Sequence, residues 1–163
     1  MTEPGSGSDA AALATRAVRD GNDWVLNGSK MFITQGSEAG VTVVLAANDP
    51  GAKHRGITAF AIEAGTAGFT HHKLRGKLGV RSSDTAELAL QDVRVPDSAR
   101  VGRVGSGFLD AMSILDKGRI SIGAMALGIG EAALTAALAY AKERKQFGHP
   151  IADFQGLQWM LAD

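Results

Sequence analysis

The first nine residues hold the side chains best suited to contact a ligand. Thr2, Ser6 and Ser8 supply hydroxyl groups, and Gly5 and Gly7 allow the backbone to approach another molecule closely. Such a loop suits phosphate oxygens or a flat polar heterocycle. The same composition is also typical of a flexible linker, so the loop by itself leaves both interpretations open.

A second candidate is a charged pair farther along the chain. Asp116 and Arg119 are three residues apart, so on a helix they share a face. An arginine in that position could bind a phosphate, and the alternative is an ordinary surface salt bridge. His71 and His72 have no second group of metal ligands nearby and are interpreted as solvated strand residues. The absence of cysteine excludes disulfides and thiolate metal sites.

Composition excludes several classes of protein. Equal numbers of basic and acidic residues, 17 of each, argue against a nucleic-acid-binding surface. The opening residues do not resemble a signal peptide, and the lack of cysteine favours a cytoplasmic location. Residues 120–141 are largely apolar, with Glu131 as the only charged residue. Because they are rich in alanine and glycine, they favour a buried helix of a soluble bundle, and we expect no membrane span.

The first hundred residues predict β-structure. Residues 14–19 alternate with the period of a strand, residues 20–23 form a turn, and a return strand begins at Trp24. The apolar run 41–47 predicts a strand buried on both faces, and further strands are expected at 57–63 and 85–91. Short strands separated by turn residues favour an antiparallel β-barrel or sandwich over alternating βαβ units.

After Ser106, a suitable N-cap, the apolar period becomes helical. The helical pattern ends in basic residues before Gly148, and a second helix is expected to begin near Ala152. We therefore predict an α+β protein with a β-domain over residues 1–103. Residues 104–163 would form the first helices of an antiparallel bundle, which is incomplete because the long helix is too apolar to stand alone.

Several ordered segments resemble the acyl-CoA dehydrogenase family. The most specific are residues 2–9, Thr-Glu-Pro-Gly-Ser-Gly-Ser-Asp, and residues 27–34, Asn-Gly-Ser-Lys-Met-Phe-Ile-Thr. The other segments are residues 79–85, 92–96, 115–119 and 140–148, continued by Gln155 and 160–163. The resemblance covers essentially the whole chain. It implies a flavoprotein that oxidises acyl-CoA to trans-2-enoyl-CoA, passes electrons to an electron-transfer flavoprotein, and assembles as a homotetramer or homodimer.

The resemblance also assigns roles to individual residues, with FAD as the implied cofactor. The implied contacts of the flavin pyrimidine and pyrophosphate are Met1, Thr2, Gly7 and Ser8, those of the isoalloxazine ring are Phe32, Ile33 and Thr34, and those reaching the FAD of a neighbouring subunit are Arg144, Phe147 and Gln155. Ser8 would also lie beside the acyl chain, and Asp116 and Arg119 near the CoA group. From the residues alone, Phe32 is better interpreted as a core residue, and Arg144 as part of a solvated helix end.

The resemblance leaves the catalytic base outside these residues. Enzymes of this family remove an α-proton with a carboxylate, which in most members lies downstream of Asp163. A minority place it on the long helix, where this sequence has Gly118, which cannot abstract a proton. Two alternatives therefore remain open: a flavin-dependent monooxygenase or nitroalkane-oxidase-like relative on the same fold, or an inactive binding or assembly fragment.

Overall fold

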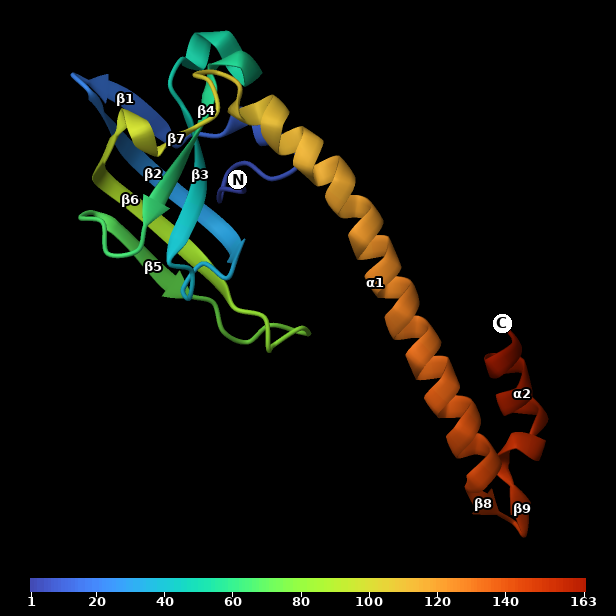
Figure 1. Ribbon diagram of the computed structural model, residues 1–163. Helices are drawn as coiled ribbons and strands as arrows, with labels where there is room; N and C mark the ends of the chain where they lie inside the picture. Colours follow the sequence, from blue (N-terminus) through green and yellow to red (C-terminus); the bar gives the residue numbers. More distant parts are fainter. The chain divides into compact units, whose positions relative to one another are not determined.

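The computed structural model describes all residues, 1–163, and the chain forms two compact units, Met1–Ser113 and Ile114–Asp163. The first unit is built around one seven-stranded sheet (Figure 1). Its strands are β1 (Arg16–Asp20), β2 (Asp23–Thr34), β3 (Val41–Ala47), β4 (Ile57–Glu63), β5 (Phe69–Lys73), β6 (Thr85–Pro96) and β7 (Arg100–Val101). A short 3-10 turn, η1 (Ala10–Ala12), precedes β1, and two more, η2 (Pro50–Gly56) and η3 (Asp97–Ala99), lie between strands.

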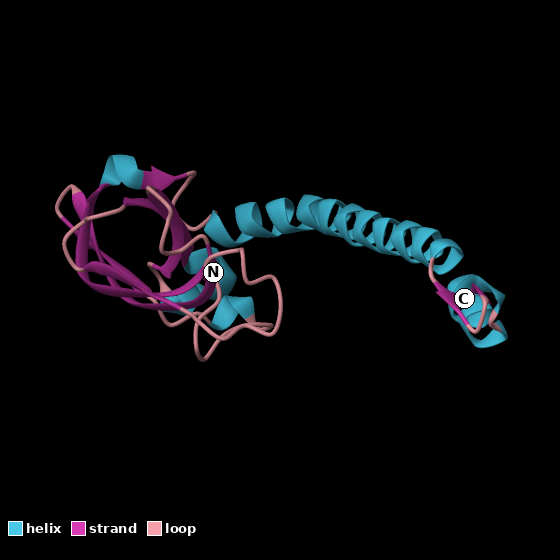
Figure 2. Ribbon diagram, turned by 90° about the horizontal axis from the view of Figure 1, so that it is seen from below, coloured by secondary structure: helices cyan, strands magenta, loops and turns pink.

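The strands follow the order β5-β6-β2-β1-β3-β4-β7. Neighbours are antiparallel except β1 and β3, which meet in parallel at Arg16 and Ala47. The sheet curls strongly (Figure 2), but its end strands are not paired with each other. The α+β class is confirmed. The barrel is not, because β7 pairs only with Ala59 and Phe60, which leaves the sheet open at that edge.

The hollow of the curled sheet holds the main hydrophobic core. Inward residues of β2, β3, β4 and β6 alternate with outward ones, as the two-residue strand period requires. Trp24 packs against Phe60 with ring centroids 5.3 Å apart, and its Nε1 donates to Asp97 Oδ1 at 2.8 Å. The buried members of this cluster are Ala17, Trp24, Leu26, Val44, Ala46, Phe60, Ile62, Leu90, Val93 and Val95.

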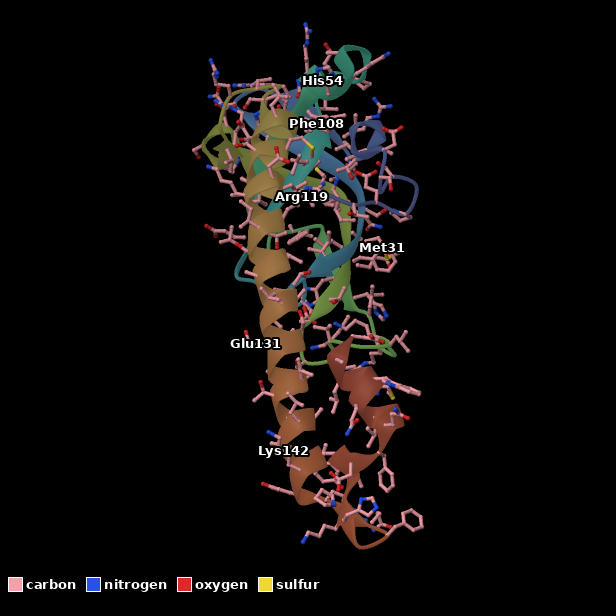
Figure 3. The ribbon with its side chains drawn as sticks, turned by 90° about the vertical axis from the view of Figure 1, so that its right-hand side faces the viewer. Met31, His54, Phe108, Arg119, Glu131 and Lys142 are labelled. Atoms are coloured by element: carbon pink, nitrogen blue, oxygen red, sulfur yellow. The ribbon has the colours of Figure 1, made fainter.

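The strand predicted at 41–47 is confirmed in its bounds but not in its burial. Alternate residues of β3 point outward. Of these, Val41 and Val43 at the start of the strand are exposed, whereas Leu45 and Ala47 near its end are buried. A second apolar cluster, which includes Leu45 and Ile57, covers that later half. Phe108, at the start of the long helix α1 (Gly107–Glu143), packs against this cluster and lies close to His54 (Figure 3).

The start of α1 is fixed to β4 through backbone contacts. The N–H of Gly105 donates to Thr58 Oγ1 at 2.8 Å, and Gly107 lies so close to β4 that an added Cβ would be 2.8 Å from the backbone nitrogen of Ala59. Ser106 precedes the helix as predicted. Its hydroxyl bonds to the carbonyl of Arg103 and the carboxylate of Asp110, so it does not cap a helix N–H.

The second unit contains the rest of α1, the hairpin of β8 (Lys145–Gln146) and β9 (His149–Pro150), the turn η4 (Ile151–Asp153) and the helix α2 (Gln155–Ala162). In α1 beyond Ser113, Ala141 is the one buried residue, and apolar side chains such as Ile120 and Leu127 are exposed. By length and composition alone, α1 could cross a membrane.

Replacing Gly107 by alanine tests the contact between α1 and β4. The new methyl group must displace strand backbone, so we expect Gly107→Ala to lower the free energy of unfolding by about 1–3 kcal/mol. Gly123→Ala is the matched control, since open space surrounds that helical glycine and alanine should raise helix stability by about 0.5–1 kcal/mol. Urea denaturation of both variants measures the difference. If the two variants changed the free energy of unfolding by the same amount and in the same direction, the close approach of Gly107 to β4 would not matter to stability.

Candidate functional site

A bulge in β2 interrupts the sheet at the segment that sequence analysis associates with a ligand. The register against β6 shifts between Lys30 and Ile33, so Met31 and Phe32 are left without partners in that strand. Phe32 has a φ of 59°, and its side chain is 67% exposed. Bulges turn side chains in new directions and are common beside active sites. Phe32 is therefore not a core residue, and its ring faces outward.

The N-terminal segment lies directly against this bulge. The backbone N–H of Met31 donates to the carbonyl of Thr2 at 2.9 Å, which replaces the strand partner that the bulge removes. Glu3 and Ser6 then exchange two backbone hydrogen bonds, and the Ser6 hydroxyl donates to the carbonyl of Asp9 at 2.6 Å. The Gly/Ser loop, residues 2–9, is thus a tight turn beside β2, not a free linker. The structure brings the two predicted ligand segments together.

A buried ion pair holds the two segments in this position. Lys30 Nζ lies 2.6 Å from Glu3 Oε1, and the two side chains are 1% and 4% exposed. Glu3 also accepts from the backbone N–H of Ala14 at 2.6 Å and of Thr15 at 3.1 Å, and Lys30 donates to the carbonyl of Leu45 at 2.6 Å. Burial opposes ionisation of Glu3, but the hydrogen bonds from Lys30, Thr15 and Ala14 outweigh it and lower the pKa of its carboxyl group.

The end of β2 is held by Asp84, which precedes β6. Its carboxylate accepts from the hydroxyl of Ser37 at 2.7 Å and from the N–H of Ser37 at 2.9 Å, and lies 3.2 Å from Lys73 Nζ. Its carbonyl accepts from the N–H of Gln35 at 3.0 Å. The bonds from the Ser37 hydroxyl and N–H, followed by Lys73, lower the pKa of Asp84 to about 2. The turn after Thr34 is therefore fixed to the next strand.

The remaining predicted residues of the first unit lie around this bulge. Thr34 is exposed and pairs with Thr85, while Ile33 is half-buried and pairs with Ala86. Gly7 and Ser8 are exposed, and their N–H groups form no hydrogen bond within the chain. Met1 and Thr2 are half-buried, with Met1 packed against the second apolar cluster. Free N–H and hydroxyl donors thus lie in the loop beside the strand that presents an exposed aromatic ring.

The other predicted residues belong to the second unit. Asp116, Gly118 and Arg119 are exposed on α1, and the ion pairs of the chain involve none of them. An added Cβ at Gly118 would meet nothing, so the position is open. The alternative of an Asp116–Arg119 salt bridge is therefore not observed. Figure 3 labels Arg119 on its helix.

The last predicted residues lie in or beside the hairpin of the second unit. Phe147 lies at its tip with a φ of 54°, is 90% exposed, and meets Phe154 edge to face at 6.1 Å. Arg144 is exposed, and its carbonyl accepts from the N–H of Ile151 at 2.8 Å. Gln155 is exposed as the first residue of α2. These side chains are presented to solvent by a short, hydrogen-bonded turn.

Sequence reasoning missed Glu3, Lys30 and Asp84 as positioning residues. A lysine four residues after the apolar Leu26, and so on the same face of a strand, was the available signal, because a charged side chain at an inward position must have a partner. Its partner, 27 residues away, could not be read from spacing. Asp84 lay within a segment already noted for its family resemblance, but nothing in the sequence linked it to Ser37.

Comparison with known proteins identifies the family. Residues 1–93 match the acyl-CoA dehydrogenase middle domain, and residues 105–163 match the acyl-CoA dehydrogenase C-terminal domain. The chain belongs to the acyl-CoA dehydrogenase family. The second match includes α1, so this apolar helix is assigned to the C-terminal domain of the family and not to a membrane span.

Individual relatives agree with this acyl-CoA dehydrogenase assignment. The chain is 50% identical to the short-chain specific acyl-CoA dehydrogenase of Clostridium acetobutylicum and 47% identical to the acryloyl-CoA reductase (NADH) of Anaerotignum propionicum, in each case over 100% of the chain. It spans only 43% and 42% of their lengths. A glutaryl-CoA dehydrogenase from Mycobacterium smegmatis in complex with FADH2 superposes with a TM-score of 0.90 at 40% identity, over 99% of this chain and 40% of that one.

The low pKa of Asp84 predicts a specific acid sensitivity. The pKa of Asp84 in the folded protein, about 2, lies below its ordinary pKa of 3.8. The charged carboxylate therefore stabilises the fold fully at pH values above 3.8, and this stabilisation is lost as the pH falls towards 2. We expect Asp84→Asn to lower the melting temperature by about 5 °C at neutral pH, and this deficit to shrink as pH falls from 4 towards 2.

Thermal melts across that pH range measure the effect, with Glu63→Gln, an exposed carboxyl on the same sheet, as the control. A deficit that stays constant with pH would show that Asp84 acts without its charge.

Proposed function

We propose that the bulged segment of β2 and the Gly/Ser loop together bind the flavin of FAD. The residues fit such a group, because an exposed aromatic ring at Phe32 lies beside a loop with unused donors at Gly7 and Ser8. The Met31–Thr2 hydrogen bond, which joins the two segments, is the observation that carries this proposal. In this arrangement Phe32 and Ile33 would lie behind the isoalloxazine ring, with the Thr34 hydroxyl near N5.

The loop would hold the polar edge of the cofactor. Successive free N–H groups at Gly7 and Ser8, together with the Ser8 hydroxyl, form a donor set suited to pyrophosphate oxygens. Added Cβ atoms at Gly5 and Gly7 would meet nothing in the chain, so the loop has open space on its outer side. Met1 and Thr2 would contact the pyrimidine edge. A relative bound to FADH2 supports FAD as the cofactor.

The exposed residues of the second unit would contact the substrate and the cofactor of a neighbouring subunit. We assign Asp116 and Arg119 to the CoA moiety of an acyl-CoA substrate, with Ser8 beside the acyl chain. Arg144, Phe147 and Gln155 would reach the FAD of a neighbouring subunit in a homotetramer or homodimer. The boundary between the β-domain and the helical domain is proposed between residues 103 and 104.

The reaction we propose for the complete protein is oxidation of acyl-CoA to trans-2-enoyl-CoA. Bound flavin would supply the hydride acceptor at N5, with an electron-transfer flavoprotein as the subsequent electron acceptor. The residues of this chain would bind and orient the cofactor and the substrate, and none of them is assigned the role of taking the α-proton. Gly118 cannot do so, and the base is assigned to a glutamate outside these residues.

Two observations keep alternatives in view. A relative named acryloyl-CoA reductase is 47% identical, which favours the reverse direction, reduction of an enoyl-CoA, as the second candidate. The glycine at position 118, where a minority of the family carry the base, is equally compatible with a monooxygenase or nitroalkane-oxidase-like activity, or with an inactive binding or assembly role for the 163 residues by themselves.

Replacing Phe32 tests the flavin site. Loss of the stacked ring should raise the Kd of the complete protein for FAD about tenfold in Phe32→Ala. Val18→Ala is the matched control, because Val18 is an exposed apolar residue on β1 away from the bulge. Titration of the apoprotein, followed by flavin fluorescence, measures both. Equal affinity in the two variants would contradict the placement of the cofactor.

Anaerobic addition of acyl-CoA tests the reaction. We expect the visible flavin absorption of the complete protein to bleach, and Arg119→Gln to need about tenfold more acyl-CoA for half-bleaching with little change in the limiting rate. Lys117→Gln, an exposed neighbour on another helix face, is the control. Absence of bleaching, or oxygen consumption coupled to a hydroxylated product, would contradict the dehydrogenase proposal. If enoyl-CoA reoxidises the reduced flavin faster than the electron-transfer flavoprotein does, the result would favour the reductase.

A further inference from the structure

The Glu3–Lys30 pair is the most deeply buried ionic interaction in the chain, yet neither residue is among those proposed to contact the cofactor or the substrate. Lys30 is among the largest of the fully buried side chains. Removing two charges from water costs several kcal/mol per ion, and apolar residues of similar volume often stabilise a core as well or better. A buried pair of this kind therefore needs an explanation other than stability.

The hydrogen bonds of Glu3 indicate what the pair does. Its carboxylate binds the N–H groups of Ala14 and Thr15, which lie 11 and 12 residues farther along the chain. One carboxylate therefore closes the segment that contains the Gly/Ser loop, with its two ends held at the same point. Thr15 continues into the sheet, where its carbonyl accepts from the N–H of Ala47 at 2.8 Å.

Lys30 fixes where this closed loop lies. It is the last residue of β2 before the bulge that still pairs with β6, and its Nζ reaches both Glu3 and the carbonyl of Leu45 on β3. The next residue, Met31, then donates to Thr2. Two adjacent residues of β2 thus bind two adjacent residues of the N-terminal segment, so the segment cannot shift along the strand without breaking both contacts.

We propose that Glu3 and Lys30 are positioning residues, which set the register of the Gly/Ser loop against the β2 bulge and so fix the distance between the loop donors and Phe32. This inference rests on the proposed flavin site for its functional consequence, but the register itself does not depend on the cofactor. The polarity of each contact is specific, since Glu3 must accept from backbone N–H groups and Lys30 must donate to a backbone carbonyl. A reversed pair could not make the same bonds.

The test compares Lys30→Met with Val93→Ala in the complete protein. Val93 is fully buried in the main core, away from the pair, and provides a matched loss of stability. Hydrogen exchange of the apoprotein is measured at Met31, Ala14 and Thr15 relative to Phe60, a core strand residue. We expect Lys30→Met to speed exchange at Met31, Ala14 and Thr15 about 100-fold more than at Phe60, whereas Val93→Ala should change the exchange of all four residues by a similar factor.

The same variants are then titrated with FAD. Lys30→Met should raise the Kd about tenfold and alter the visible circular dichroism of the bound flavin, and Val93→Ala should change neither. If Lys30→Met does not fold, the double variant Glu3→Gln/Lys30→Met removes both charges and leaves no uncompensated ion, and the same selective exchange is expected. The reversed pair, Glu3→Lys/Lys30→Glu, should not restore protection.

The outcomes separate this inference from the proposed function. Uniform exchange in Lys30→Met, or protection restored by the reversed pair, would overturn it, because the pair would then contribute only stability or charge balance. Selective exchange with an unchanged Kd would also overturn it, since the register would not matter to the cofactor. If the unmodified protein binds no FAD, the proposed function fails, while the exchange measurement still decides whether the pair sets the register.

Discussion

The carboxylate of Glu3 accepts hydrogen bonds from Lys30, Ala14 and Thr15 in a place that almost no water reaches. Such a charge is tolerated only when its hydrogen-bonding capacity is filled, so the groups that fill it cannot move independently. Glu3 belongs to the N-terminal segment, and its donors belong to the residues just before β1 and to the middle of β2, so one interaction fixes three parts of the chain relative to one another. The geometry of the candidate site follows from that constraint.

The bulge in β2 is the second consequence of the same arrangement. A bulged residue loses its ladder partner, and an unpaired backbone N–H beside a core is costly. Here Thr2 supplies the acceptor for Met31, so the bulge is stable only while the N-terminal segment stays in register. Phe32, held at a positive φ that few aromatic residues adopt, is directed outward as a result. A locally unfavourable backbone is thus maintained by contacts made on either side of it.

Much of this fold was readable from pattern. Apolar runs gave the bounds of β3 and β4, and the change of period after Ser106 gave the start of α1. The open edge of the sheet was not readable, because it depends on β7 being only two residues long. β5 was also not assigned from the sequence, since its residues are mostly polar and exposed and show no alternation. Periodicity detects an element through its buried face, so elements without one escape it.

The segments proposed to bind the ligand were singled out by family resemblance, but the residues that position them were not. Glu3 and Lys30 are 27 residues apart, and Asp84 is 47 residues from the serine it holds. Separations of this size carry no local signal, because the contact exists only after the sheet has formed. A lone lysine in an alternating strand was the single hint, and it could show that a partner was needed without showing which one.

The two units fix their proposed functional residues by different physical means. In the first unit, Phe32, Thr34 and the Gly/Ser loop are bound to a sheet with a complete core, so their positions are set before any ligand arrives. In the second, Asp116 and Arg119 project from helical turns that bury almost nothing within the unit. Helical hydrogen bonds alone set their spacing and shared face. Changes to the first group or its supports should therefore alter folding and binding together, whereas changes to the second should affect binding without a cost in stability.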